Sequence, residues 1–137
     1  MRKIPLTLLI VLSSILFTSG ATAQNQPLAC QVEKNAGLAW ENGQWITKTF
    51  IPFTSKFILV QAGNTLTTDS VAKVLRTTSD VSCRYPINSI ECTDRSGGAL
   101  FFGLKTLKGG VAQLIGSTEE DNQRDTVTVQ VFSCTRF

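Results

Sequence analysis

Histidine is absent from this chain of 137 residues, and its absence removes several kinds of chemistry. Without an imidazole there is no Ser-His-Asp or Cys-His catalysis, and no ordinary proton shuttle that titrates near neutral pH. Metal sites built on histidine ligands are excluded as well. We therefore expect no catalytic residues, no bound metal and no cofactor.

The chain also lacks a run of basic residues. Lys and Arg together number 13, against 10 Asp and Glu. Arg2 and Lys3 lie in a leader that we expect to be removed, which leaves 11 basic and 10 acidic residues. Such a balanced chain has no electrostatic surface suited to polyanions. Nucleic acid and an anionic membrane are therefore poor candidates for a partner.

Residues 1–23 have the pattern of a secretory signal peptide. Arg2 and Lys3 form its positive start, residues 4–17 are mostly apolar, and Ala21-Thr22-Ala23 provides an A-x-A cleavage site. The apolar run is too short for a comfortable membrane span, and polar residues follow it. We expect cleavage before Gln24, a periplasmic or secreted protein without a membrane anchor, and one domain over residues 24–137.

All four cysteines lie in the expected exported part. An even number of cysteines in an oxidising compartment predicts two disulfides. Zinc is disfavoured because no pair has C-x₂₋₄-C spacing. Of the three pairings we favour Cys83–Cys92, which closes a local hairpin, with Cys30–Cys134, which ties the first strand to the last. Spacing alone leaves the other two pairings open.

Hydrophobic patterns predict strands along most of the chain. In residues 126–134, Val127, Val129 and Val131 alternate with polar residues, so we expect these valines to face the core. Residues 57–60 are apolar without alternation, which is typical of a strand covered on both faces. Further short strands are expected within residues 29–34, 38–50, 83–92, 99–104 and 111–115, with Gly109-Gly110 as a turn.

The dipeptide Asn42-Gly43 predicts a type I′ hairpin turn. A two-residue turn at this place sets Trp40 opposite Trp45 at a non-hydrogen-bonded position, where side chains approach most closely. We expect both tryptophans in the core, with a platform for a sugar or peptide as the alternative. Phe53, in a loop with a proline, is the other candidate for contact with a partner.

Residues 68–75 predict a short helix with Val71, Val74 and Leu75 on one side. Ser70 and Lys73 in this segment form an S-x-x-K pattern, which in some hydrolases brings a lysine amine to a nucleophilic serine. The companion motifs of those enzymes are missing, so we favour a solvated serine and lysine.

The acidic run Glu119-Glu120-Asp121 lacks the spacing of a calcium loop and is expected to be a polar connection.

Many short segments at near-regular spacing favour an antiparallel fold. We expect a mainly β, single antiparallel domain, a partly open barrel or sandwich of about seven to eight short strands with one short helix and two disulfides.

Three features of the chain resemble small signal-peptide-bearing proteins of proteobacteria whose function is uncharacterised. They are W-x-x-G-x-W at Trp40 to Trp45, the step from Cys92-Thr93-Asp94 into Gly97-Gly98, and Arg124-Asp125 before a strand that ends in Cys134. The resemblance implies a bacterial periplasmic location and assigns no catalytic residue.

The chain is expected to be exported and held together by disulfides, and it has few groups suited to catalysis. We therefore expect a non-enzymatic binding protein with a protein partner, such as an inhibitor or an immunity-type factor. A small barrel that carries an apolar ligand is the alternative, favoured by a cavity above ~300 Å³ lined by phenylalanines. An S-x-x-K hydrolase is the third hypothesis.

Overall fold

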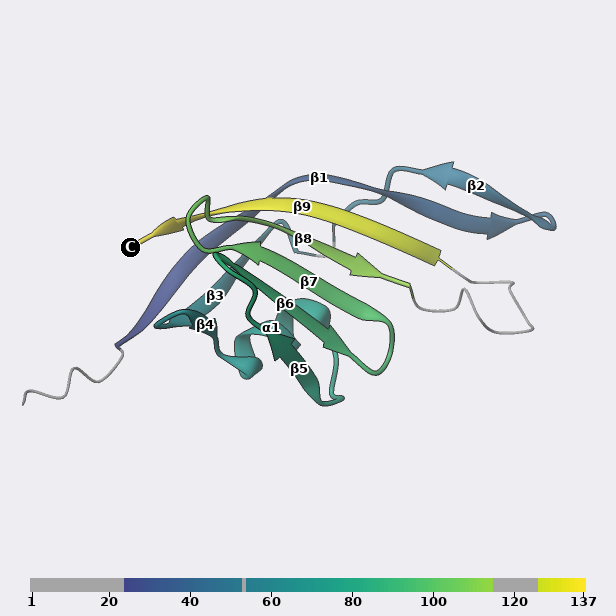
Figure 1. Cartoon of the computed structure of the whole chain (residues 1–137). Coiled ribbons are helices and arrows are strands. Elements are labelled where there is room, and N and C mark those ends of the chain that lie inside the picture. Colours follow the sequence, from purple (N-terminus) through teal and green to yellow (C-terminus); the bar gives the residue numbers. More distant parts are fainter. Residues whose placement is uncertain (1–23, 53, 115–125) are drawn as a thin grey trace, which may run out of the picture.

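The computed structural model describes residues 24–52, 54–114 and 126–137. Within these residues nine strands form a single antiparallel sheet that curls into a half-barrel, and one helix, α1 (Thr68–Leu75), lies on its concave side (Figure 1). The predicted mainly β antiparallel domain is confirmed, as an open barrel rather than a sandwich.

The strands in chain order are β1 (Asn25–Glu41), β2 (Gln44–Lys48), β3 (Lys56–Ala62), β4 (Thr65–Leu66), β5 (Val81–Arg84), β6 (Ser89–Asp94), β7 (Gly98–Gly103), β8 (Lys108–Gln113) and β9 (Thr126–Arg136). Their order across the sheet is β4-β3-β1-β9-β8-β7-β6-β5, and β2 pairs only with β1. The helix contacts β3 and β5, near the two edges of the sheet. It therefore lies across the open side of the half-barrel.

Strand β1 is one strand of 17 residues, where the sequence predicted separate short strands within residues 29–34 and 38–50. Its first half pairs with β3, its far end pairs with β2, and β9 pairs along most of its length. A register shift between Val32 and Lys34 marks a β-bulge. The extra residue changes which positions face inward, from Leu28 and Cys30 before the bulge to Ala39 after it.

The hydrophobic core lies between the concave face of the sheet and α1. Phe132 of β9 is at its centre: its ring meets Phe57 edge-to-face at a centroid distance of 5.0 Å and stacks on Phe102 at 6.2 Å. Val71 and Leu75 of α1 close the core from the other side, as the helix pattern predicted. Aromatic pairs of this kind add to the free energy gained by burial alone.

The predicted orientation of β9 is wrong. Val129 is 49% exposed and Val131 44% exposed, whereas Phe132 and Cys134 are buried. Successive side chains of a strand point to opposite faces, so only one of these sets faces the core. Phe132 stacks in the core and Cys134 is joined to Cys30, and these two contacts hold the valines on the convex face.

Two smaller expectations are also corrected. Gly109 and Gly110 lie inside β8 rather than in a turn. A Cβ at Gly109 would lie 2.4 Å from Cζ of Phe132 and 2.5 Å from the carbonyl oxygen of Phe101, so this glycine lets the core aromatic approach the backbone. Ile58 of β3 is exposed, so the strand is covered on one face only.

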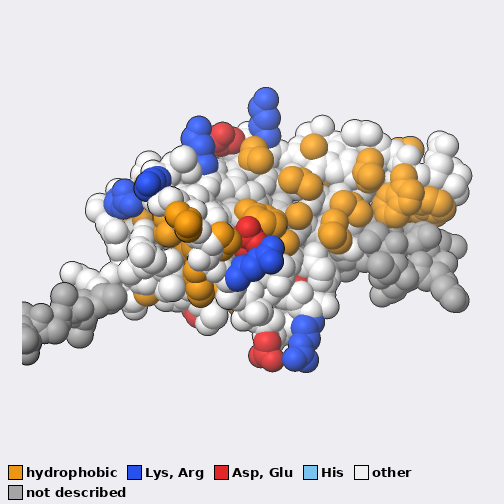
Figure 2. Space-filling model, in the orientation of Figure 1, with side chains coloured by type: hydrophobic (Ala, Val, Ile, Leu, Met, Phe, Trp, Pro, Cys, Tyr) orange, Lys and Arg blue, Asp and Glu red, His pale blue; other side chains and the backbone are white. Residues whose placement is uncertain are grey.

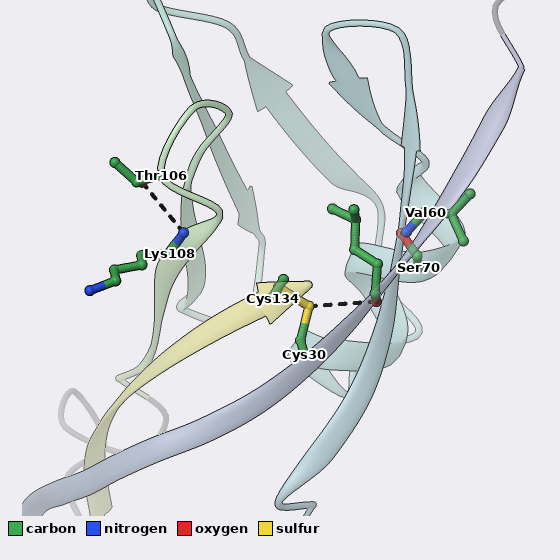
Figure 3. The surroundings of a disulfide bond; sticks show 7 residues. Cys30, Val60, Ser70, Thr106, Lys108 and Cys134 are labelled. Carbon is green, nitrogen blue, oxygen red and sulfur yellow. Dashed lines mark hydrogen bonds between the residues drawn. A yellow bond between two sulfur atoms is a disulfide. The ribbon is translucent and has the colours of Figure 1, made fainter. Parts of the chain in front are cut away.

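Both favoured disulfides are confirmed. Cys30 of β1 lies directly opposite Cys134 of β9, and Cys83 lies opposite Cys92 between β5 and β6. Figure 3 shows the first bond joining two adjacent strands at the heart of the sheet. Such bonds indicate an oxidising environment. In the described part of the chain, no helix is both long and apolar enough to cross a membrane.

Candidate functional site

The convex side of the sheet carries a continuous row of apolar side chains from five strands. The register sets Trp45 beside Trp40, Val127 beside Leu38, and Ala112 beside Val129. Gly110 then separates Val131 from Phe101. We call this surface the outer apolar face and define it by Leu38, Trp40, Trp45, Phe101, Val129 and Val131. Figure 2 shows hydrophobic side chains as a band across the sheet that ends at the β1–β2 hairpin.

These side chains are open to solvent to an unusual degree for their size. Phe101 is 50% exposed and Trp45 is 37% exposed, in addition to the two valines of β9. Exposed apolar residues are normally scattered singly over the surface of a monomeric protein. A contiguous row of them makes this face a candidate binding surface.

The tryptophans lie at the far end of the outer apolar face. Asn42 and Gly43 have φ of 51° and 80°, as the predicted I′ turn requires, and Trp40 pairs with Trp45 as expected. Their rings meet edge-to-face, with centroids 5.4 Å apart. The expectation that both belong to the core is wrong, because the hairpin extends beyond the helix-covered part of the sheet. Phe53, the third candidate, lies outside the described residues.

Charged groups border the outer apolar face. Lys34 lies opposite Val131, and Lys108 lies opposite Ser133 further along β9. Glu91 of β6 is next to Phe101 and is ion-paired with Arg84. The rim is therefore polar and carries more positive than negative charge, an arrangement typical of protein interfaces.

A second candidate site is a pocket of about 350 Å³ on the concave side. Phe57 of β3, Val74 of α1 and Val111 of β8 line its apolar part. The remaining lining side chains are mostly basic or polar: Thr54, Lys56, Lys73, Arg76, Gln113 and Gln130, together with Ile58. The volume of this pocket exceeds the minimum expected of a ligand carrier. Its lining differs from that expectation, because it contains one phenylalanine rather than several.

The S-x-x-K residues do not form a nucleophile pair. Ser70 is buried, and its Oγ donates to the carbonyl oxygen of Thr67 at 2.9 Å. The same Oγ accepts from the N–H of Val60 at 3.2 Å, and Figure 3 shows these two residues next to each other. Lys73 is exposed, and its Nζ donates to Oδ2 of Asp69 at 2.8 Å. The expectation of a solvated serine is therefore wrong. The buried Ser70 hydroxyl instead links α1 to β3.

Asp94 is a carboxylate in the β6–β7 turn whose pKa is shifted. Burial raises the pKa, but the N–H of Gly98, the hydroxyls of Ser96 and Thr77 and the N–H of Ser96 all donate to this side chain and together lower it below its ordinary value. The bonds to Gly98 and Ser96 are 2.7 to 2.9 Å long. This carboxylate holds the β6–β7 turn in place.

Among the described residues no cluster of three potential metal ligands occurs. The acidic run Glu119-Glu120-Asp121 lies outside them, so its interpretation stays a prediction.

Of the outer apolar face, only the two tryptophans were predicted from the sequence as candidates for a partner contact. A usable signal was present in β9, where Val129 and Val131 alternate with Gln130 and are followed directly by Phe132 and Cys134. Apolar residues at both parities show that both faces of the strand carry apolar groups. No family model, curated protein or solved structure matches this chain.

Proposed function

We propose that this protein is a small exported binding protein, periplasmic or secreted, that docks a partner protein on its outer apolar face and has no catalytic activity. An inhibitor or immunity-type factor is the role that such a module suits. The single observation behind this proposal is the row of exposed apolar side chains on β2, β1, β9 and β7. The two disulfides are compatible with export.

The chemistry of the face indicates the kind of partner. The edge-to-face tryptophan pair offers large, rigid contact area, and tryptophan is enriched among residues that dominate binding energy. Lys34 and Lys108 at the rim favour acidic groups around the partner's apolar patch.

The pocket supports a second candidate function, the carrier of a small ligand. Its volume of about 350 Å³ lies at the lower end of the ~300–1,000 Å³ that ligand pockets span. This function does not compete for the same surface, because none of the residues that define the outer apolar face lines the pocket.

Trp45→Ser tests the docking proposal. Removal of a tryptophan that dominates binding at an interface typically weakens binding by about 2 kcal/mol or more, roughly 30-fold in Kd. The immobilised wild-type protein should retain a partner from periplasmic extract, identified by quantitative mass spectrometry, and the variant should retain far less of it. Trp45 lies beyond the core, so the variant should stay folded and lose only the edge-to-face contact with Trp40, about 0.5–1.5 kcal/mol of stability.

Ile87→Ser is the matched control. Ile87 is 93% exposed, but it lies in the β5–β6 turn and is not one of the residues of the outer apolar face. This variant should retain the partner as the wild type does. Equal retention of every protein by Trp45→Ser and wild type would refute the proposal, as would a stable dimer of the wild-type chain in light scattering.

A further inference from the structure

We propose that the outer edge of strand β2 takes up an extended, uncharged segment of the partner protein, which adds a further strand to the sheet beside Trp45. The inference rests on the proposed docking function and specifies how the partner binds. Its evidence is the hydrogen-bond pattern of the β1–β2 hairpin, the lack of cover at this edge and the side chains of β2.

The register of the hairpin determines which backbone groups of β2 are free. In an antiparallel pair, only alternate residues exchange hydrogen bonds with the residue opposite, and the N–H and C=O of the others point away from the neighbouring strand. The two-residue turn makes Glu41 and Gln44 a hydrogen-bonded pair. Trp45 and Thr47 follow at the other parity of β2, so both are at non-hydrogen-bonded positions. Their N–H and C=O groups therefore point to the outer edge of β2.

The outer edge of β2 is uncovered in the part of the chain that the structure describes, because β2 pairs only with β1. Proteins usually shorten or cover edge strands, since unpaired backbone groups recruit other chains. The edge of β3 is covered in this way: the N–H of Val60 donates to Ser70 and its C=O accepts from Thr67 at the start of α1. Strand β5 is short and packs against α1. The β1–β2 hairpin instead extends beyond the helix-covered part of the sheet (Figure 1).

The side chains of β2 suit an uncharged, apolar strand. On one face Trp45 is 37% exposed, and on the other Ile46 is half-buried. Lys48 is the one charged residue of β2, and its ion pair with Glu41 offsets the charge that would otherwise guard the edge. Side chains opposite each other on neighbouring strands share a face and pack together. β-branched or aromatic residues of the partner would therefore pack beside Trp45 and Ile46.

An added strand would extend the outer apolar face. Trp45 lies both on this face and at the edge, so apolar side chains of the new strand would continue the row beyond it. In strand addition, main-chain hydrogen bonds supply affinity and alternate side chains supply specificity. The two kinds of contact therefore belong to one continuous surface.

Selection from a displayed library of random nine-residue linear peptides against the disulfide-bonded protein tests the inference. The wild type should enrich uncharged peptides rich in β-branched and aromatic residues. A synthetic copy of the most enriched peptide should change the fluorescence of Trp40 and Trp45, the two tryptophans of the chain. Methylation of the peptide's backbone nitrogens, one at a time, should weaken binding at every second position only, because alternate amides face β2.

Thr47→Pro removes an outward N–H from the edge and should weaken binding of this peptide at least about tenfold, because the peptide carbonyl opposite it loses its donor. Proline is tolerated where the N–H of an edge strand faces solvent, so the variant should stay folded. Thr47→Ala is the matched control. It changes the side chain and keeps the N–H, so its Kd for the peptide should stay within about twofold of the wild type.

The possible failures are distinguishable. The edge site would be overturned by a selection without enriched peptides, by equal binding of the peptide to Thr47→Pro and wild type, or by losses at consecutive methylated positions. If Thr47→Pro retained the partner from extract and Trp45→Ser did not, the docking function would stand and the added strand would be refuted. A wild-type protein that retains no partner, or that forms a stable dimer, would overturn both.

Discussion

Replacing Cys30 and Cys134 with serine is expected to lower the free energy of unfolding by roughly 4.7 kcal/mol, against about 2.7 kcal/mol for the same change at Cys83 and Cys92. The first disulfide joins residues 104 apart in sequence and the second joins residues 9 apart. A longer loop restricts the unfolded chain more, so its loss costs more stability. Domains of this size are stable by only ~5–15 kcal/mol, which makes the difference large.

Urea unfolding of the two double variants measures this difference. The Cys30–Cys134 variant should have the lower midpoint, and hydrogen exchange should show the earliest loss of protection in β9, because the end of that strand is then untied. The Cys83–Cys92 variant serves as control, since it also loses one cross-strand disulfide. Equal midpoints would show that loop length does not govern the contribution of these bonds.

Phe102→Ala is expected to destabilise the protein by about 3–5 kcal/mol, whereas Phe101→Ala costs less than about 1 kcal/mol. The two phenylalanines are neighbours on β7 and differ in the face that they occupy. Phe102 is buried and stacks on Phe132, so its loss leaves a cavity in the core. Phe101 lies on the outer apolar face and leaves none.

This pair of variants is internally matched, because residue type, strand and substitution are the same. Thermal or urea unfolding at equal protein concentration gives the two values. Similar losses of stability at both positions would mean that the convex face is covered within the protein, contrary to the observed exposure.

Local features of the fold were predictable from sequence. The Asn42-Gly43 turn determines the pairing of Trp40 with Trp45, because a two-residue turn leaves one register. The spacing of Val71, Val74 and Leu75 predicted the short helix. The disulfides were predictable because one pairing joins the first strand to the last and the other closes a local loop. Each of these depends on residues close in sequence or on a small number of combinations.

Features that depend on long-range packing were not predictable. The valine alternation in β9 has the period of a half-buried strand, but period alone does not say which face is buried. The choice was made by Phe132 and Cys134, whose partners lie on β1, β3 and β7. In the same way Gly109 has the sequence of a turn, and only the ring of Phe132 above it explains why glycine is required within a strand.

The two candidate sites were less predictable from the sequence than the fold was. The outer apolar face takes its residues from β1, β2, β7 and β9, so it exists only once the strand order is known. The pocket joins Lys56 to Lys73 and Gln130 across three elements. The tryptophans were the single part of either site that sequence singled out, and there the expected burial was wrong because the hairpin extends past the core.

Urea unfolding of Val129→Ser with Val131→Ser tests most directly whether the convex face is left open for a partner. Both valines are on the outer apolar face, and exposed substitutions of this kind typically change stability by less than about 0.5 kcal/mol each. The predicted result is a midpoint close to that of the wild type. A loss of about 1.5–3 kcal/mol for each valine, the value for side chains that are fully buried, would contradict the account.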